Sequence, residues 1–159
     1  VDAAGFASIP GEQIARRMKL SNNQRRRICH LVSQPELPRD GWDQPGLRRL
    51  VQEVGAESLE DLLALHAGDI APLPDVEART AELASLRGDL ERVLAQKPAL
   101  STSDLAVNGR DLMSHLSLAP GPSLGIIMRA LLERVLDDPE LNEQEALLDL
   151  AESINAKLG

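Results

Sequence analysis

The chain is nearly devoid of aromatic side chains, since its 159 residues include one Trp, one Phe and no Tyr. Leucine and alanine must therefore form the core, and this composition favours helices over strands. Proteins that recognise single-stranded nucleic acid base by base rely on aromatic stacking platforms, which this chain lacks. The one tryptophan, Trp42, lies in a proline-rich loop and is expected to cover a helical core rather than to stack on a base.

Cysteine and histidine are also scarce. Cys29 is the one cysteine, so no internal disulfide can form, which is typical of a reducing compartment and predicts a cytoplasmic protein. His30, His66 and His115 are far apart, and no pair has metal-ligand spacing, so no metal site is expected. No apolar run approaches the roughly 18 residues of a membrane span. A secretory signal pattern is absent from residues 1–30, and no membrane partner is expected.

The net charge of −8 is unevenly distributed. Residues 1–50 contain nine of the 17 Lys and Arg residues but only five of the 25 Asp and Glu residues, whereas residues 51–159 contain eight and twenty. An acidic surface repels a polyanion. Any phosphate-binding surface is therefore predicted mainly in the first third of the chain.

Apolar spacing and breaker residues predict an all-α fold of about seven or eight helices with no sheet. The spacing of prolines and the run Ile70 to Pro74 suggest three parts. These are a helical subdomain with a basic face over 1–72, a long connecting helix over 73–98, and a helical tail subdomain over 99–159. The first five helices are expected near residues 12–18, 21–33 and 45–54, from Ser58 past His66, and over 75–97. The last three are expected between Gly109 and Pro120, from Pro122 past Val135, and from Asn142 to Leu158.

Glycines and prolines mark the joints of the last third. Asn108-Gly109 is a turn dipeptide, and Pro120-Gly121-Pro122 ends one apolar pattern and opens the next. Gly125 follows in the first turn of an amphipathic helix, where a missing Cβ would allow another backbone to approach closely. Asn142 with Glu145 forms a capping-box pattern that predicts the start of the last helix. That helix is expected to turn four residues inward: Leu147, Leu150, Ile154 and Leu158.

This order of joints resembles the C-terminal part of class II tRNA nucleotidyltransferases (CCA-adding enzymes) and bacterial poly(A) polymerases. The earlier segments M-K-L-S-N-N-Q-R-R-R-I and S-L-E-D-L-L-A-L-H-A-G-D match more loosely. The matching residues of the last third are Asp104, Leu105, Gly109, Asp111, Leu112, Met113, Leu118, Pro120, Gly121, Pro122, Gly125, Leu131, Leu132, Val135, Pro139 and Asn142.

The resemblance implies a bacterial parent enzyme that adds CCA or A residues to RNA 3′ ends, using Mg²⁺ with ATP or CTP. Enzymes of this family carry a Gly-Ser element and an Asp-x-Asp pair that binds two metal ions. This chain has no Gly-Ser dipeptide and no Asp-x-Asp. Because these motifs are missing and Val1 is not an initiator methionine, we expect the chain to be the non-catalytic body and tail portion of such an enzyme. Its partner would be the N-terminal catalytic head of the same enzyme, and we expect this portion to bind no cofactor. Whether the parent adds CCA, CC, A or poly(A) depends on the head.

The resemblance also implies that this portion holds RNA, with the backbone of the tRNA acceptor and T stem as the partner. The predicted contacts form a basic helix face near the start of the chain and a weaker group near the proline-glycine joint, because guanidinium groups pair bidentately with phosphate oxygens. A solvated helix face is the alternative interpretation of the first group. The candidate residues are Arg16, Arg17, Lys19, Arg25, Arg26, Arg27, Arg110, Gly121, Gly125 and Arg129.

The joint from Pro120 to Gly125 is similar to the hairpin of helix-hairpin-helix modules, in which backbone N–H groups at a helix start hold a phosphate. Two of its positions are prolines, which have no N–H to donate, so a purely structural turn that packs two helices closely is the alternative. A different class of function, a protein–protein interaction or oligomerisation module, is suggested by the heptad-like run from Val76 to Leu94. A hydrolase of the HD type finds no support, because no His-Asp dipeptide is present.

Overall fold

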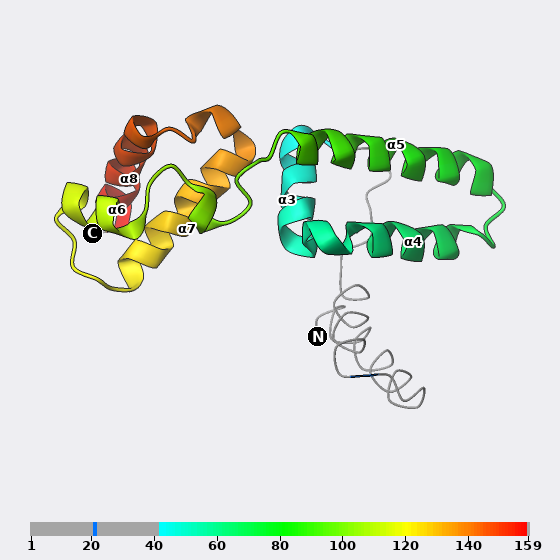
Figure 1. Cartoon of the computed structure of the whole chain (residues 1–159), viewed down its shortest axis with the longest axis horizontal. Coiled ribbons are helices and arrows are strands. Elements are labelled where there is room, and N and C mark those ends of the chain that lie inside the picture. The colour runs from blue at the N-terminus through cyan, green and yellow to red at the C-terminus, as the bar shows by residue number, and fades with distance from the viewer. Residues whose placement is uncertain (1–20, 22–41, 159) are drawn as a thin grey trace. The chain divides into compact units, whose positions relative to one another are not determined.

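A computed structural model describes Ser21 and residues 42–158, which contain six α-helices, three short 3-10 helices and no strand. The all-α prediction is confirmed for this part of the chain (Figure 1). The predicted helices near 12–18 and 21–33 lie outside the described residues, apart from Ser21, and each of the other six is found. The elements are α3 (Gln44–Val54), η1 (Ala56–Ser58), α4 (Leu59–Ile70), α5 (Val76–Ala95), η2 (Thr102–Asp104), α6 (Gly109–Leu116), α7 (Pro122–Asp137), η3 (Pro139–Leu141) and α8 (Gln144–Leu158).

The chain divides into two compact units. The first unit comprises residues 1–41 and 54–87, and the second comprises residues 42–53 and 88–159. α3 therefore belongs to the second unit although it precedes α4 in sequence. The predicted three-part division over 1–72, 73–98 and 99–159 stays a prediction.

In the first unit, α4 begins where the sequence predicts. Gly55 has φ +83°, a left-handed value that favours glycine, and it ends α3 before the short helix η1. Ser58 is the N-cap of α4, although its side chain makes no capping hydrogen bond. Leu59, Leu62 and Leu63 are buried, as helical spacing requires. Arg87 of α5 forms an ion pair with Glu60 of α4 at 2.9 Å.

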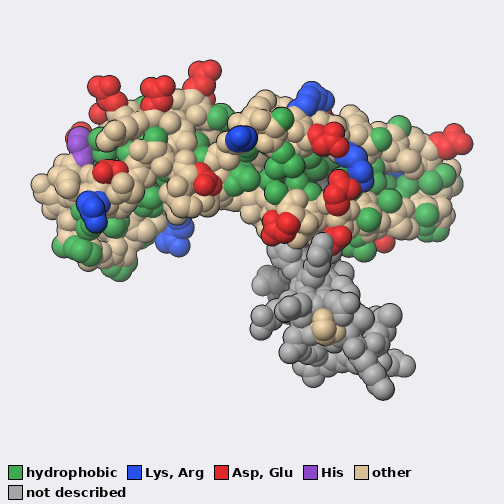
Figure 2. Space-filling view, viewed as in Figure 1, with side chains coloured by type: hydrophobic (Ala, Val, Ile, Leu, Met, Phe, Trp, Pro, Cys, Tyr) green, Lys and Arg blue, Asp and Glu red, His purple; other side chains and the backbone are tan. Residues whose placement is uncertain are grey.

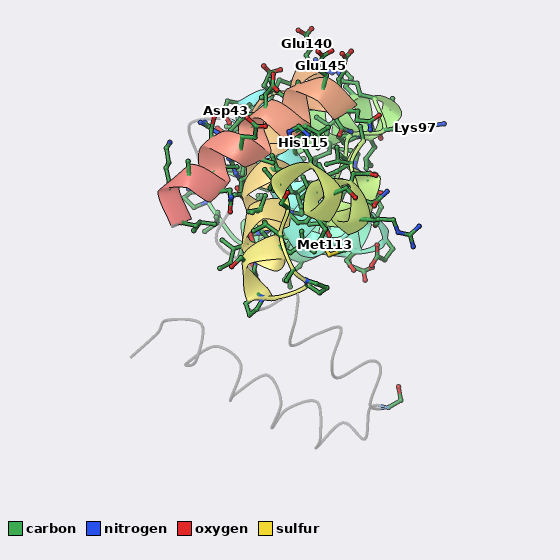
Figure 3. The ribbon with its side chains drawn as sticks, turned by 90° about the vertical axis from the view of Figure 1, so that its left-hand side faces the viewer. Asp43, Lys97, Met113, His115, Glu140 and Glu145 are labelled. Carbon is green, nitrogen blue, oxygen red and sulfur yellow. The ribbon has the colours of Figure 1, made fainter. Side chains whose placement is uncertain are left out.

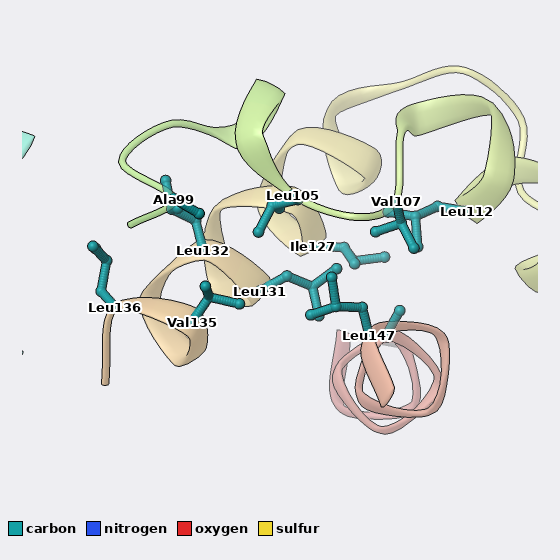
Figure 4. Packing of buried hydrophobic residues seen from close by; sticks show 11 residues of the cluster. Ala99, Leu105, Val107, Leu112, Ile127, Leu131, Leu132, Val135, Leu136 and Leu147 are labelled. Atoms are coloured by element: carbon teal, nitrogen blue, oxygen red, sulfur yellow. The ribbon is translucent and has the colours of Figure 1, made fainter. Parts of the chain in front are cut away.

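A hydrophobic cluster of the second unit is centred on α7 (Figure 4). The buried face of α7 has the predicted helical spacing, although Leu124 and Met128 at its N-terminal half are only partly buried. The last helix contributes Leu147, as predicted, and also Ala151, whereas Leu158 is 48% exposed and the prediction that it faces inward is wrong. The core residues are Ala99, Leu105, Val107, Leu112, Ile127, Leu131, Leu132, Val135, Leu136, Leu147 and Ala151.

The predicted role of Asn142 as the cap of the last helix is also wrong. α8 begins at Gln144, and Asn142 ends η3 instead. Its Oδ1 accepts a hydrogen bond from the Ala106 amide at 2.8 Å, and its Nδ2 donates to the Asp104 carbonyl at 3.1 Å. The asparagine therefore ties the loop before α6 to the junction before α8. These two bonds use both the oxygen and the nitrogen of the Asn142 side chain, so they compete with a role in capping α8.

α6 ends abruptly, and this positions the joint that follows. Ser117 has φ 52° and ψ 38°, a left-handed conformation that stops the helix. The Leu118 amide donates to the Met113 carbonyl at 3.1 Å and closes the turn. No described helix is both long and apolar enough to cross a bilayer.

Candidate nucleic-acid interface

The predicted RNA-contacting residues fall into two groups in the structure. The six basic residues of the first group (Arg16, Arg17, Lys19, Arg25, Arg26 and Arg27) lie outside the described residues. The other four (Arg110, Gly121, Gly125 and Arg129) all belong to the second unit. Arg110, Gly121 and Gly125 lie at the starts of α6 and α7, and Arg129 lies in the middle of α7.

The start of α6 is fixed by a complete capping box. Asn108 Oδ1 accepts hydrogen bonds from the amides of Arg110 at 2.9 Å and Asp111 at 3.2 Å. In return, the Asp111 carboxylate accepts a bond from the Asn108 amide at 2.9 Å. Arg110 is thereby held in the first turn of α6 with an exposed side chain.

The starts of α6 and α7 lie next to each other, and Gly109 is part of this contact. A Cβ at Gly109 would come within 3.2 Å of Leu124 Cδ2, in the first turn of α7. Close approach was predicted at Gly125, but a Cβ there would meet nothing within 4 Å. The prediction placed the tight contact at the wrong glycine, since the face of α7 that carries Gly125 is exposed.

The first turn of α7 offers few backbone donors. Gly121 is its N-cap with no side-chain cap, and its φ of 178° is extended backbone open to any residue. Pro120 and Pro122 have no N–H, and the Leu124 amide donates back to the Gly121 carbonyl at 3.2 Å. A helix start ordinarily leaves four unpaired N–H groups, so this joint is a poorer phosphate cradle than an ordinary one.

Arg110 and Arg129 are exposed, and neither side chain forms an ion pair within the described residues. Arg129 lies one turn after Gly125 on α7, so both occupy the same face of that helix. The side chains of Lys97, Arg134 and Lys157 also form no ion pair within the described residues. What distinguishes Arg129 is its surroundings in sequence, because no Asp or Glu occurs between Asp111 and Glu133.

Five acidic residues of the second unit lie between Asp137 and Glu145, at the junction of α7 and α8, and Figure 2 shows acidic side chains along the upper edge of this unit. Glu140 and Glu145 lie at one end of the unit, while Met113 of α6 lies toward the other end (Figure 3). The macrodipole of α7 adds partial positive charge at its start and negative charge at its end. The electrostatic field therefore favours an anion at the start of α7 over its end. The acidic residues of the junction are Asp137, Asp138, Glu140, Glu143 and Glu145.

Sequence reasoning missed two arginines that serve the end of α7. Arg48 of α3 is only 5% exposed, and its guanidinium donates to the carbonyls of Leu136 at 2.6 Å and Asp137 at 2.8 Å. These carbonyls have no partner within their own helix, so the side chain caps its C-terminus. Nothing in the local sequence signals this contact, because the two segments are 88 residues apart.

Arg49 binds the same end of α7 from outside. It donates to the carboxylates of Asp137 at 2.7 Å and Glu133 at 3.5 Å. The hydrogen bond to Asp137 raises the pKa of the Arg49 guanidinium, so it is always charged. Two of the nine basic residues in the first third are thus bound to the end of α7. Fewer basic side chains of that third are therefore free to bind phosphate than its composition suggests.

Trp42 packs over the first turn of α3, and the prediction that it covers a helical core stays a prediction. A Cβ at Gly46 would lie 3.1 Å from Trp42 Cε3, so the indole rests on the glycine. The indole nitrogen is buried and has no hydrogen-bond partner within the described part of the chain. Within the same part, no three His, Cys, Asp or Glu residues are grouped as a metal site would need.

The sequence model of the family described as tRNA nucleotidyltransferase domain 2 (putative) matches residues 7–151. The chain therefore belongs to this family, as the resemblance of its last third suggests. The match extends over the less similar first half as well.

Several curated relatives are CCA-adding enzymes. The enzyme of Lactococcus lactis subsp. cremoris is 29% identical over 143 residues, which are 90% of this chain and 31% of the relative. The enzyme of Lactiplantibacillus plantarum is 35% identical over 68 residues, or 43% of this chain and 17% of the relative. The chain thus spans less than a third of these relatives. No solved structure matches it.

Proposed function

We propose that the chain is the RNA-holding, non-catalytic portion of an enzyme that adds CCA or A residues to RNA 3′ ends. The observation that carries the proposal is the match of residues 7–151 to the tRNA nucleotidyltransferase domain, together with relatives that are CCA-adding enzymes. The substrate of the parent would be tRNA, and its catalytic head would bind Mg²⁺ and use ATP or CTP.

The division of labour follows from what the sequence contains. Metal-dependent phosphoryl transfer needs carboxylates that hold two cations, and the sequence has no Asp-x-Asp pair for them. A helical unit with exposed, unpaired arginines can hold a phosphate backbone without such chemistry. We therefore assign holding of the RNA duplex to this chain and nucleotide addition to a separate head.

Two surfaces would contact the RNA. The first is the basic run from Arg16 to Arg27, which has the larger local surplus of positive charge. The second comprises Arg110, in the first turn of α6, and Arg129, in the middle of α7. The scarcity of backbone donors around Pro122 leaves the guanidinium groups as the main phosphate ligands of this second surface.

The test is the salt dependence of tRNA binding by the parent protein. Replacement of both Arg110 and Arg129 by Glu should weaken binding, and the slope of log K against log salt should flatten by about 0.9 for each duplex phosphate that is no longer neutralised. Replacement of both Arg26 and Arg27 by Glu should do the same for the first surface. The readout is affinity measured at several salt concentrations by filter binding or anisotropy.

The matched control replaces Arg134 and Lys157 by Glu, because these two are also exposed and unpaired and the net charge changes equally. Arg134 lies in the last turn of α7, next to the acidic junction. Its double variant should change affinity much less than either test pair. If a test pair leaves both affinity and slope at wild-type values, that surface is not part of the interface.

An oligomerisation module stays the alternative. The heptad-like run on α5 would need an exposed apolar face to pair with a second copy. Leu86, Leu90 and Val93 are already buried within the single chain, which favours the RNA-holding function. Sedimentation at increasing concentration distinguishes the two, since a dimer that Leu86→Glu dissociates while each protomer stays folded would support the alternative.

A further inference from the structure

Asn108 and Gly109 form the one Asn-Gly dipeptide of the chain. This pair is chemically reactive in unfolded chains, because a glycine offers no side chain to hinder attack by its backbone nitrogen on the asparagine side chain. Asn108 is also exposed, so water reaches it. The dipeptide therefore has the composition and the access of a spontaneous modification site.

The fold holds this dipeptide in an unreactive geometry. Ring closure needs Cβ of Asn108 and the nitrogen of Gly109 to be nearly eclipsed, whereas ψ of Asn108 is 172°, which keeps them staggered. The amide oxygen is held by the backbone N–H groups of Arg110 and Asp111. The backbone N–H of Asn108 donates to the Asp111 carboxylate, and this bond fixes the backbone of the residue as well.

We infer that Asn108 is a latent deamidation site that the α6 capping box keeps closed. When the cap opens, the Gly109 nitrogen attacks Cγ of Asn108, a C–N bond forms, the Cγ–Nδ2 bond breaks, and ammonia leaves with the displaced proton. Water then opens the five-membered imide at either carbonyl and gives aspartate or isoaspartate. No oxidant, reductant or metal takes part in this sequence.

The two products differ in their effect on the second unit. Aspartate is as good an N-cap as asparagine, so the helix survives with one more negative charge beside Arg110. Isoaspartate adds a methylene to the backbone at the point where Gly109 packs on Leu124 Cδ2. A longer backbone at this contact would displace Leu124, so we expect isoaspartate to weaken the packing of α6 on α7.

The experiment incubates the whole chain in mildly alkaline buffer, with and without denaturing urea, and follows the peptide containing Asn108 by mass spectrometry. Exchange of the amide for a carboxyl group gives the mass gain, and the two isomers separate by chromatography. We expect the folded chain to deamidate far more slowly than the unfolded one. In the folded Asp111→Ala variant the rate should rise about fivefold, as expected when a cap is lost and reaction proceeds through local opening.

Asp104→Ala is the matched control, because Asp104 occupies the same position in the Ser101 capping box and makes no hydrogen bond to Asn108. Its rate at Asn108 should equal that of the wild type. Asn108→Ser keeps a capping oxygen but should show no mass gain, which identifies the reacting residue. Equal rates in the folded and unfolded wild-type chain would overturn the inference, and this comparison needs no variant to fold.

Discussion

Arg48 joins α3 to α7 within the second unit through two carbonyl oxygens that would otherwise be unpaired. A buried guanidinium is costly unless it is fully bonded, and here the ligands are the last carbonyls of a helix. The negative end of the helix macrodipole adds to the attraction. This one side chain therefore couples the position of α3 to the integrity of α7.

Arg48→Ala should lower the free energy of unfolding by about 2–4 kcal/mol, because two charge-assisted bonds disappear and the Leu136 carbonyl stays buried. Arg49→Ala is the neighbouring control. Its ion pairs are 41% exposed on the arginine side, so its removal should cost less than about 1 kcal/mol. Urea unfolding measures both, and equal costs for the two variants would contradict the capping role.

Asp104 predicts a dependence of stability on pH. Its Oδ2 accepts a bond from the Ser101 hydroxyl at 2.7 Å and further bonds from the amides of Ser101 and Leu100, and the hydroxyl bond is the main cause of the lowered pKa of its carboxyl group. Because the folded pKa lies below the unfolded one, the stabilisation is present at neutral pH. It is lost as the pH falls through the folded pKa.

The measurement compares the urea midpoint of the wild type with that of Asp104→Asn at neutral and acidic pH. The variant keeps the shape of the side chain but carries no charge, so other carboxylates cancel in the difference. We expect the wild type to be more stable at neutral pH, with the difference shrinking on acidification. A difference that grows as the pH falls would refute this assignment.

Asn142 joins two elements that are far apart in sequence, the loop before α6 and the turn before α8. Asn142→Ala should destabilise the second unit by about 1–2 kcal/mol, since the Ala106 amide and the Asp104 carbonyl lose their side-chain partner. Hydrogen exchange measures this directly, because the Ala106 amide should exchange faster in the variant. Unchanged protection at Ala106 would show that the hydrogen bond does not form in solution.

The helices of the described part could be predicted from local signals, but their contacts could not. The apolar spacing of α7 and the positions of Pro122 and Gly55 correctly predict where helices begin and end. Asn142 belongs to an equally good capping pattern, yet its side chain accepts a hydrogen bond from the backbone N–H of Ala106 instead. A local pattern states what a residue can bond, and only the fold decides which of several partners it meets.

The same reason explains the errors in the candidate site. Gly109 and Gly125 both lie near the start of a helix, and nothing in the sequence says which one faces a neighbour. The structure places Leu124 against Gly109 and leaves Gly125 open. Charge and spacing suggest Arg110 and Arg129, which stay predicted contacts. The roles of Arg48 and Arg49 could not be predicted, because they depend on a helix that begins more than seventy residues later.

Charge is unevenly distributed along the chain, and this predicts a kinetic effect on the proposed RNA binding. The acidic junction after α7 carries three exposed glutamates without an ion pair in the described part, Glu140, Glu143 and Glu145. A negative region repels RNA over roughly a Debye length of 10 Å at 0.1 M salt. Its field should therefore slow the approach of RNA while leaving the contacts of bound RNA unchanged.

Replacement of these three glutamates by glutamine in the parent protein should raise the association rate for tRNA about two- to tenfold at low salt. The dissociation rate should change little, because none of the three lies on the predicted interface. Stopped-flow association at low and high salt measures the effect. An increase that persists at high salt would contradict an electrostatic origin.

The contact between Arg48 and the end of α7 has a consequence for synthesis on the ribosome. The arginine emerges 88 residues before the first carbonyl that it binds. At synthesis rates of roughly 5–20 residues per second, α3 waits about 4–18 s for its partner. During this interval the Arg48 guanidinium, buried in the finished protein, has no helix end to bind. The nascent chain thus carries an incomplete second unit until its last third is made.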